Sequence, residues 1–175
     1  MRITISGPPG SGKTTVCRIV ADELGIECVI SGDVFRQMAR DHEMSLAEFG
    51  LLAEQDPSYD RMLDDRMVEL ARENENILLE GRLTAHMLTD DGLEAFRVLL
   101  DADLDERARR VAEREDLDPQ EAKGRITERE RCEAARYREY YGIDIDDRSI
   151  YDLIVDTTSI TAEEVSDVIL EGLRE

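Results

Sequence analysis

Several kinds of residue are scarce in this 175-residue chain. It contains no tryptophan, three phenylalanines, three cysteines and two lysines. The cysteines Cys17, Cys28 and Cys132 are odd in number and widely spaced, so they do not form the C-x-x-C pairs of zinc and redox sites. We therefore expect reduced, structural thiols. His42 and His86 are isolated in the sequence, which favours ordinary side-chain packing over a metal site.

Long apolar segments are missing as well. No run of about 18 apolar residues occurs, and residues 1–6 lead into a glycine-rich loop rather than into the apolar stretch of a signal peptide. The length fits one domain over residues 1–175, and a hydrophobic content of 41% is sufficient for a core. We therefore expect a soluble, cytoplasmic, monomeric protein with no membrane partner.

Positive charge is outweighed by negative charge. The chain contains 42 acidic residues but only 20 arginines and two lysines, which gives a net charge of −20. This balance argues against a nucleic-acid partner, because affinity for nucleic acids comes mostly from cationic contacts to phosphates. The acidity and the excess of arginine over lysine are typical of halophilic proteins, since at about 1 M salt the Debye length is about 3 Å and repulsion between carboxylates is screened. A merely acidic soluble protein is the alternative.

Short apolar segments alternate with amphipathic ones along the chain. Strands are predicted over residues 1–6, 27–30, 76–82, 97–102 and 152–157. Helices are predicted over residues 14–24 and 34–40, and after the capping residues Ser45, Asp56 and Thr161. This order predicts a single α/β domain in which helices cover a five-stranded parallel sheet. Residues 103–141 are charged, poor in apolar residues and long for a crossover, so they are predicted to form a mobile helical insert.

The glycine-rich loop matches the pattern G-x-x-x-x-G-K-[ST] between a predicted strand and a predicted helix, the context that supports a phosphate-binding loop. Its backbone N–H groups and the helix N-terminus attract phosphate oxygens. Lys13 is expected to reach the β- and γ-phosphates of ATP, and Thr14 to offer its hydroxyl to Mg²⁺. The predicted ATP-binding residues are Gly7, Pro8, Pro9, Gly10, Ser11, Gly12, Lys13, Thr14 and Thr15. This role explains why position 13 is a lysine in a chain that otherwise uses mainly arginine, because a flexible point charge follows a migrating phosphoryl group better than the rigid fork of arginine does.

Arginines follow two predicted strands at the carboxyl edge of the sheet, where ligands bind in open α/β folds. Arg36 comes after the segment SGD and Arg82 directly after LLEG, and together they are suited to hold a second phosphate. The predicted insert carries two further pairs at helical spacing, Arg110 with Arg114 and Arg129 with Arg136. A solvated helix face balanced by nearby carboxylates is the alternative for each arginine of the insert.

Five segments in order carry a resemblance: GPPGSGKTT, SGDVFR, LLEGR, DERARRVAERE and ITERERCEAARYREYYGIDIDD. The chain resembles P-loop nucleoside monophosphate kinases, and most closely archaeal-type cytidylate kinases, from about Met1 to Asp156. The resemblance implies the three-layer α/β/α fold of P-loop NTPases with a helical lid. It also implies in-line transfer of a phosphoryl group from ATP to CMP or dCMP with Mg²⁺, acceptor-binding helices within residues 33–75, and a lid with its following helix at about residues 103–141.

The resemblance also implies roles for single residues. The implied catalytic residues are Lys13, Arg110, Arg114 and Arg129, and the implied acceptor-binding residues are Asp33, Arg36, Arg82, Glu133 and Arg136. Glu80 stands where related kinases often have aspartate, so we expect it to contact Mg²⁺ through a water. Glu133 likewise replaces the aspartate of bacterial relatives, which leaves its contact to the ribose open.

Two other functions stay open at this point. One is a kinase of the same fold with another small acceptor, such as UMP, AMP or a non-nucleotide, although several phosphate-directed arginines favour a nucleotide. The other is a non-catalytic, nucleotide-dependent switch, which would hydrolyse ATP slowly instead of releasing ADP when an acceptor is added.

Overall fold

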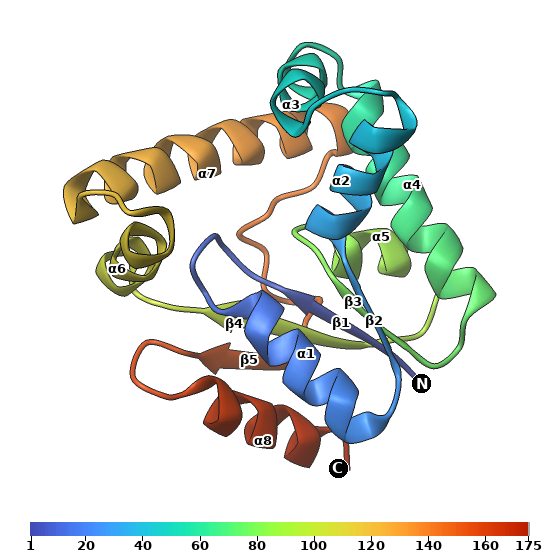
Figure 1. Cartoon of the computed structure of the whole chain (residues 1–175). Helices are drawn as coiled ribbons and strands as arrows, with labels where there is room; N and C mark the ends of the chain where they lie inside the picture. The colour runs from blue at the N-terminus through green and yellow to red at the C-terminus, as the bar shows by residue number, and fades with distance from the viewer. Residues whose placement is uncertain (175) are drawn as a thin grey trace.

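The computed structural model describes residues 1–174 and contains one parallel sheet with the strand order β2-β3-β1-β4-β5 (Figure 1). The strands are β1 (Arg2–Ser6), β2 (Glu27–Ile30), β3 (Ile77–Glu80), β4 (Phe96–Asp101) and β5 (Leu153–Asp156). Each strand lies within two residues of a predicted segment at both ends. The predicted α/β fold with five parallel strands is confirmed.

Eight helices lie among the described residues. They are α1 (Lys13–Leu24), α2 (Ser31–Asp41), α3 (Leu46–Gln55), α4 (Ser58–Glu73), α5 (Thr84–Asp90), α6 (Leu104–Glu115), α7 (Pro119–Tyr141) and α8 (Ala162–Gly172). Both predicted capping boxes are present, at Ser45 and at Thr161. Helix α2 begins directly after β2, so the segment SGD forms its first turn instead of preceding it, and α5 was not predicted. Helix α4 begins two residues after Asp56, whose carboxylate accepts the N–H of Ser58 at 2.9 Å.

The sheet is covered by helices on both faces, because alternate residues of its central strands point to opposite sides. Leu78 of β3 packs into a cluster with α1 and α8, which lie side by side in Figure 1. Its neighbours Ile77 and Leu79 pack on the other side against α4 and against Leu88 of α5. All four residues are fully buried. The continuous apolar pattern of β3 therefore reflects burial on both faces.

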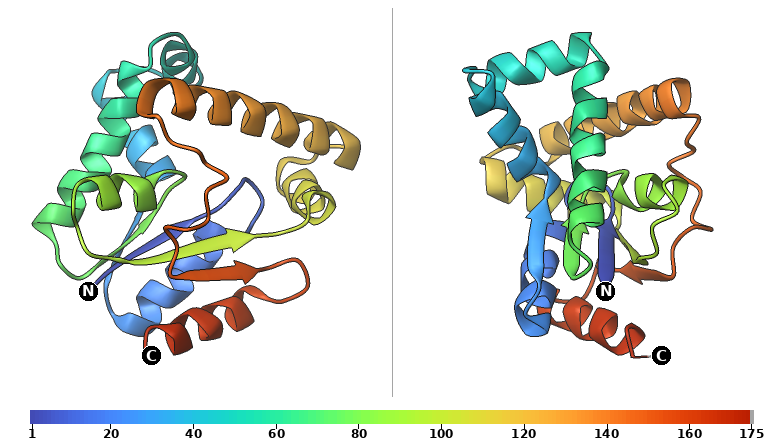
Figure 2. Two further views of the ribbon diagram at one scale, coloured as in Figure 1. Left: turned by 180° about the vertical axis from the view of Figure 1, so that it is seen from behind. Right: turned by 90° about the vertical axis from the view of Figure 1, so that its right-hand side faces the viewer.

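The predicted insert of residues 103–141 consists of α6 and α7. Small and β-branched residues of α6, including Ala108 and Val111, pack against Ala122 and Ile126 near the start of α7. Helix α7 then extends past the carboxyl edge of the sheet toward α3 and α4 (Figures 1 and 2). Its far end is held by Tyr141, whose hydroxyl donates to Asp64 of α4 at 2.8 Å. No helix of residues 1–174 is both long and apolar enough to cross a membrane.

Candidate active site

The glycine-rich loop connects β1 with α1. Gly10 adopts a left-handed φ of 81°, and a Cβ atom there would lie 2.7 Å from the carbonyl oxygen of Arg107. A Cβ atom at Gly7 would collide with the carbonyl oxygen of Leu100. Glycine is therefore required at both places, because the loop packs closely against β4 and α6. The Nζ atom of Lys13 donates to the carbonyl oxygen of Pro8 at 3.0 Å, within its own loop.

Lys13 and Glu80 form the electrostatic centre of the site. Burial lowers the pKa of Lys13 to about 8; the Glu80 carboxylate opposes this change, while Arg82 and Arg129 add to it. Glu80 ends β3 and is 6% exposed, and burial raises its pKa although Lys13 and the nearby Thr14 hydroxyl act in the opposite direction. An ammonium group, a carboxylate and a hydroxyl thus lie close together beside the phosphate loop.

This donor set fits Mg²⁺. The Thr14 hydroxyl and the Glu80 carboxylate offer the oxygen ligands that Mg²⁺ prefers, and they lie next to each other at the phosphate loop. Among residues 1–174, no three side chains of histidine, cysteine, aspartate or glutamate come together as a metal-binding group. Mg²⁺ in nucleotide sites is held by one or two protein ligands together with phosphates and waters, so two oxygens are sufficient. A direct or water-mediated contact of Glu80 stays a prediction.

A cavity of about 310 Å³ lies over the phosphate loop. The predicted site residues that line it are Gly7, Pro9, Gly10, Lys13, Thr14, Asp33, Arg36, Glu80, Arg82, Arg114 and Arg129. They come from the phosphate loop, α1, α2, the end of β3 and both helices of the insert. Asp33 and Arg36 form an exposed ion pair with a distance of 2.7 Å between Oδ1 and Nη1. The structure therefore brings together the two groups of residues expected to hold phosphates.

A second cavity of about 270 Å³ continues from the first between α2, α4 and α7. The two cavities share Ser31, Gly32, Arg82 and Arg129. Glu133, which is 5% exposed, accepts from Nε of Arg82 at 3.0 Å and from Nε of Arg129 at 2.8 Å. One buried carboxylate therefore holds two arginines that face the phosphate loop.

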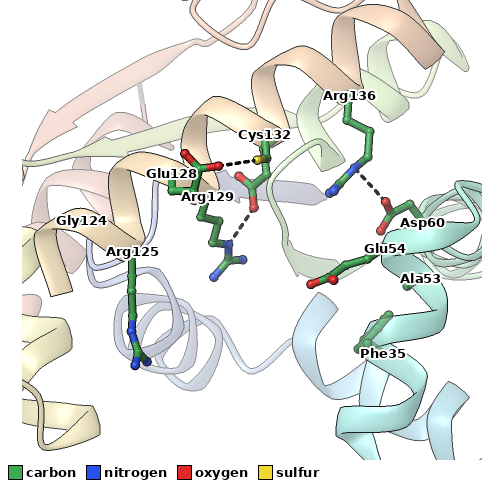
Figure 3. Close-up of a pocket in the computed structure, with 12 residues that line it drawn as sticks. Phe35, Ala53, Glu54, Asp60, Gly124, Arg125, Glu128, Arg129, Cys132 and Arg136 are labelled. Carbon is green, nitrogen blue, oxygen red and sulfur yellow. Dashed lines mark hydrogen bonds and ion pairs between the residues drawn. The ribbon is translucent and has the colours of Figure 1, made fainter. Parts of the chain in front are cut away.

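A third and larger cavity of about 950 Å³ opens along α7, between this helix and the helices α2, α3 and α4 (Figure 3). Arg129 and Arg136 reach into it from α7, and Phe35 of α2 lies across from them. Nε of Arg136 lies 3.0 Å from Oδ2 of Asp60. Phe35, Asp60, Glu133 and Arg136 line both this cavity and the second one, so the three cavities adjoin one another.

Arg110 and Arg114 differ in their surroundings, although both lie on α6. Arg114 lines the cavity over the phosphate loop. The guanidinium group of Arg110 instead donates to Gly10 at 3.2 Å and to the carbonyl and hydroxyl oxygens of Thr157 at 2.6 and 3.0 Å, respectively. Arg110 therefore connects the phosphate loop with the end of β5 and does not line the cavity. Its role in catalysis stays a prediction.

The sequence patterns did not single out Arg107, although it supports the phosphate loop. It is 7% exposed, donates to the carbonyl oxygen of Ala102 at 2.9 Å, and forms an ion pair of 3.0 Å with Glu130 of α7. Its backbone is the part of α6 that packs against Gly10. The helical spacing of the buried residues Ala108 and Val111 could have placed Arg107 on the inner face of the helix.

Comparison with known proteins gives the family. A model described as "Cytidylate kinase-like family" matches residues 2–159. The chain belongs to this family. One relative is the cytidylate kinase of Halobacterium salinarum, which is 46% identical over 99% of this chain and 89% of that protein. Another is the cytidylate kinase of Methanothermobacter thermautotrophicus, which is 47% identical over 93% of this chain and 99% of that protein. The predicted resemblance is confirmed, whereas the roles of single residues stay predictions.

Solved structures with the same fold include an uncharacterized protein from Eubacterium ventriosum, with a TM-score of 0.74 and 18% identity over 100% of this chain and 99% of that chain. Shikimate kinase from Acinetobacter baumannii in complex with shikimate has a TM-score of 0.67 and 17% identity over 99% of this chain and 92% of that chain. At these identities the likeness shows the fold alone. This member of the cytidylate kinase-like family therefore has the α/β fold of P-loop kinases.

Proposed function

We propose that the chain is a cytidylate kinase that transfers the γ-phosphoryl group of ATP to CMP and dCMP. The names of its relatives support this activity. The observation that carries the proposal is the meeting of two cavities at Arg82 and Arg129, one over the phosphate loop and one between α2, α4 and α7. Two nucleotides bound in these cavities would have their phosphates adjacent, as phosphoryl transfer requires.

The side chains act by positioning the phosphates and neutralising their charge. Protonated Lys13 would leave the carbonyl oxygen of Pro8 and bind the β- and γ-phosphates of ATP. Arg36 and Arg82 would hold the acceptor phosphate, and Arg114 and Arg129 would approach the transferring group. No general base is needed, because an oxygen of the acceptor phosphate is already anionic at neutral pH and attacks the γ-phosphorus in line.

Mg²⁺ would be held by the Thr14 hydroxyl and the phosphates of ATP, with Glu80 beside it, and would neutralise developing negative charge on the phosphates. The burial that raises the pKa of Glu80 favours its neutral form, and the nearby Lys13 ammonium favours its carboxylate. Each residue thus favours the charged form of the other, while burial opposes the charge of both. Glu80 would contact the cation through a water molecule.

Closure of the site would involve two segments. Residues 33–75 contain the acceptor-binding helices, and residues of about 103–141 form the lid with its following helix. Glu133 pairs with both Arg82 and Arg129, so the phosphates that bind these arginines would compete with a carboxylate inside the protein. Closing α6 and α7 over the phosphates would exclude water and thereby suppress hydrolysis of ATP.

The test is release of ADP by the purified protein with MgATP and, in separate reactions, CMP, dCMP, UMP, AMP or GMP, each in low and in molar KCl. We expect release that depends on CMP or dCMP. Release without any acceptor would instead indicate a nucleotide-dependent switch. No release with all five nucleotides would indicate a non-nucleotide acceptor.

A further inference from the structure

The end of the second cavity farthest from the phosphate loop carries an unusual ion pair. Asp60 of α4 and Arg136 of α7 face each other there (Figure 3), with their side chains 24% and 30% exposed. The Oδ2 atom of Asp60 and the Nε atom of Arg136 are 3.0 Å apart and closed off from solvent. Neither atom has a hydrogen bond of good geometry within residues 1–174. The two side chains therefore meet at buried atoms that are poorly satisfied, which is costly, while their remaining exposed parts line the cavity and are free to meet a ligand.

The surroundings of this pair suit a flat heterocyclic ring. Apolar side chains of α4, Leu63 and Met67, line the cavity together with the aromatic rings of Phe35 and Tyr137. Arg82 and Arg129 lie at the opposite end, beside the phosphate loop. An acceptor nucleotide whose phosphate is bound by Arg82 would extend its base toward Asp60 and Arg136.

Cytosine and uracil differ on the edge that this pair would meet. Cytosine presents a 4-amino donor followed by the acceptors N3 and O2, whereas uracil presents the acceptor O4 and the donor N3–H before O2. A carboxylate beside a guanidinium group offers an acceptor next to donors, which complements cytosine and opposes uracil. Carboxylates accept from the 4-amino group of cytosine in nucleic-acid recognition for the same reason.

We propose that Asp60 and Arg136 determine the preference for cytosine, with Asp60 accepting from the 4-amino group and Arg136 donating to N3 and O2. The inference rests on the proposed function and names the side chains that read the base. Uracil in the same position would place O4 against the carboxylate and N3–H against the guanidinium group. Sites that hydrogen-bond a substrate donor discriminate strongly against an analogue that lacks it, because their own polar groups are left unpaired.

The first experiment compares kcat/KM for CMP and UMP in wild type, Asp60→Asn and Asp65→Asn. An asparagine amide both accepts and donates, so we expect Asp60→Asn to lower the ratio of CMP to UMP by about 10- to 100-fold, in part by increasing use of UMP. Asp65 is exposed on the same helix, and Asp65→Asn removes the same charge without touching the cavity. It is expected to keep the wild-type ratio. An Asp60→Asn enzyme that loses activity equally with both nucleotides would overturn the inference.

A second measurement uses only the wild-type enzyme, so it does not depend on the folding of a variant. The 5′-monophosphate of 2-pyrimidinone riboside lacks the 4-amino group but retains N3 and O2. We expect its kcat/KM to be at least about tenfold below that of CMP. Equal use of CMP and this analogue, or of CMP and UMP, would refute the reading of the base while leaving the kinase activity established. No phosphorylation of CMP at all would instead refute the proposed function.

Discussion

Replacing Asp64 by asparagine should stabilise the folded protein at neutral pH. Asp64 lies one helical turn from Asp60, and burial raises its pKa from 3.8 to about 6. The Tyr141 hydroxyl, which donates to Asp64, and Arg136 act in the opposite direction, whereas Asp60 and Asp65 add to the rise. Asparagine retains an oxygen that accepts from Tyr141 but cannot ionise. The substitution therefore removes the cost of a buried charge and keeps the hydrogen bond.

The size and the pH range of the effect follow from this pKa. A rise of about two pH units corresponds to roughly 3 kcal/mol, which is an upper value because the side chain is not fully enclosed. The pKa is higher in the folded than in the unfolded chain, so Asp64 costs no stability below pH 3.8, and the cost grows until the pH exceeds about 6. The variant should thus gain 1–3 kcal/mol at pH 7.5, a rise in Tm of roughly 2–12 °C, and almost nothing at pH 3.5.

The assay is urea unfolding followed by circular dichroism at pH 7.5 and pH 3.5, in 1 M KCl and without nucleotide. Asp65→Asn serves as the matched control, because it removes one negative charge from an exposed place on the same helix. A gain that is the same at both pH values, or that Asp65→Asn reproduces, would show that general charge repulsion is responsible. Lower stability of Asp64→Asn at pH 7.5 would contradict the reasoning directly.

Four further outcomes are expected. Lys13→Ala should lower kcat at least about 100-fold, whereas Lys123→Ala, which removes a surface pair with Asp105, should not; near-normal turnover of Lys13→Ala would contradict its role. Arg82→Ala should raise the KM for CMP about 10- to 100-fold, and an unchanged KM would count against phosphate binding. Protonated Lys13 has a pKa of about 8 in the free protein, so kcat/KM for ATP should fall as the pH rises through 8; a flat profile up to pH 9.5 would argue against this. Activity and the free energy of unfolding should both increase from 0.1 to 2 M KCl, and a protein most stable without salt would not be halophilic.

Local patterns predicted most of the fold because each strand and cap is determined by neighbouring residues. The run NILLEGR predicted β3, and burial of Leu78 and Leu79 on opposite faces is the reason that its apolar pattern is continuous. Helix α5 was missed, since it has only seven residues and follows Arg82 almost directly. The start of α2 was predicted three residues too late, because Gly32 and Asp33 are typical of turns but lie in the first helical turn.

The phosphate side of the candidate site could also be predicted, because its motif is contiguous. Partners that are far apart in sequence could not. Glu133 joins Arg82 to Arg129 only after α7 has packed beside the sheet edge, and no spacing rule relates residues 82 and 133. Arg110 and Arg114 were placed on one helix face, yet a rotation of about 40° and the carbonyl oxygen of Thr157 give them different surroundings.

The central place of β1 in the sheet has a consequence for synthesis on the ribosome. β1 pairs with β3 and β4, and the loop that follows it is secured by the hydroxyl of Thr157, which donates to the carbonyl oxygen of Ser11 at 3.0 Å. Translation at roughly 5–20 residues per second separates Ser11 from Thr157 by on the order of ten seconds. The nascent chain thus carries its phosphate-binding segment early, whereas the contact from Thr157 that secures the loop forms only late in synthesis.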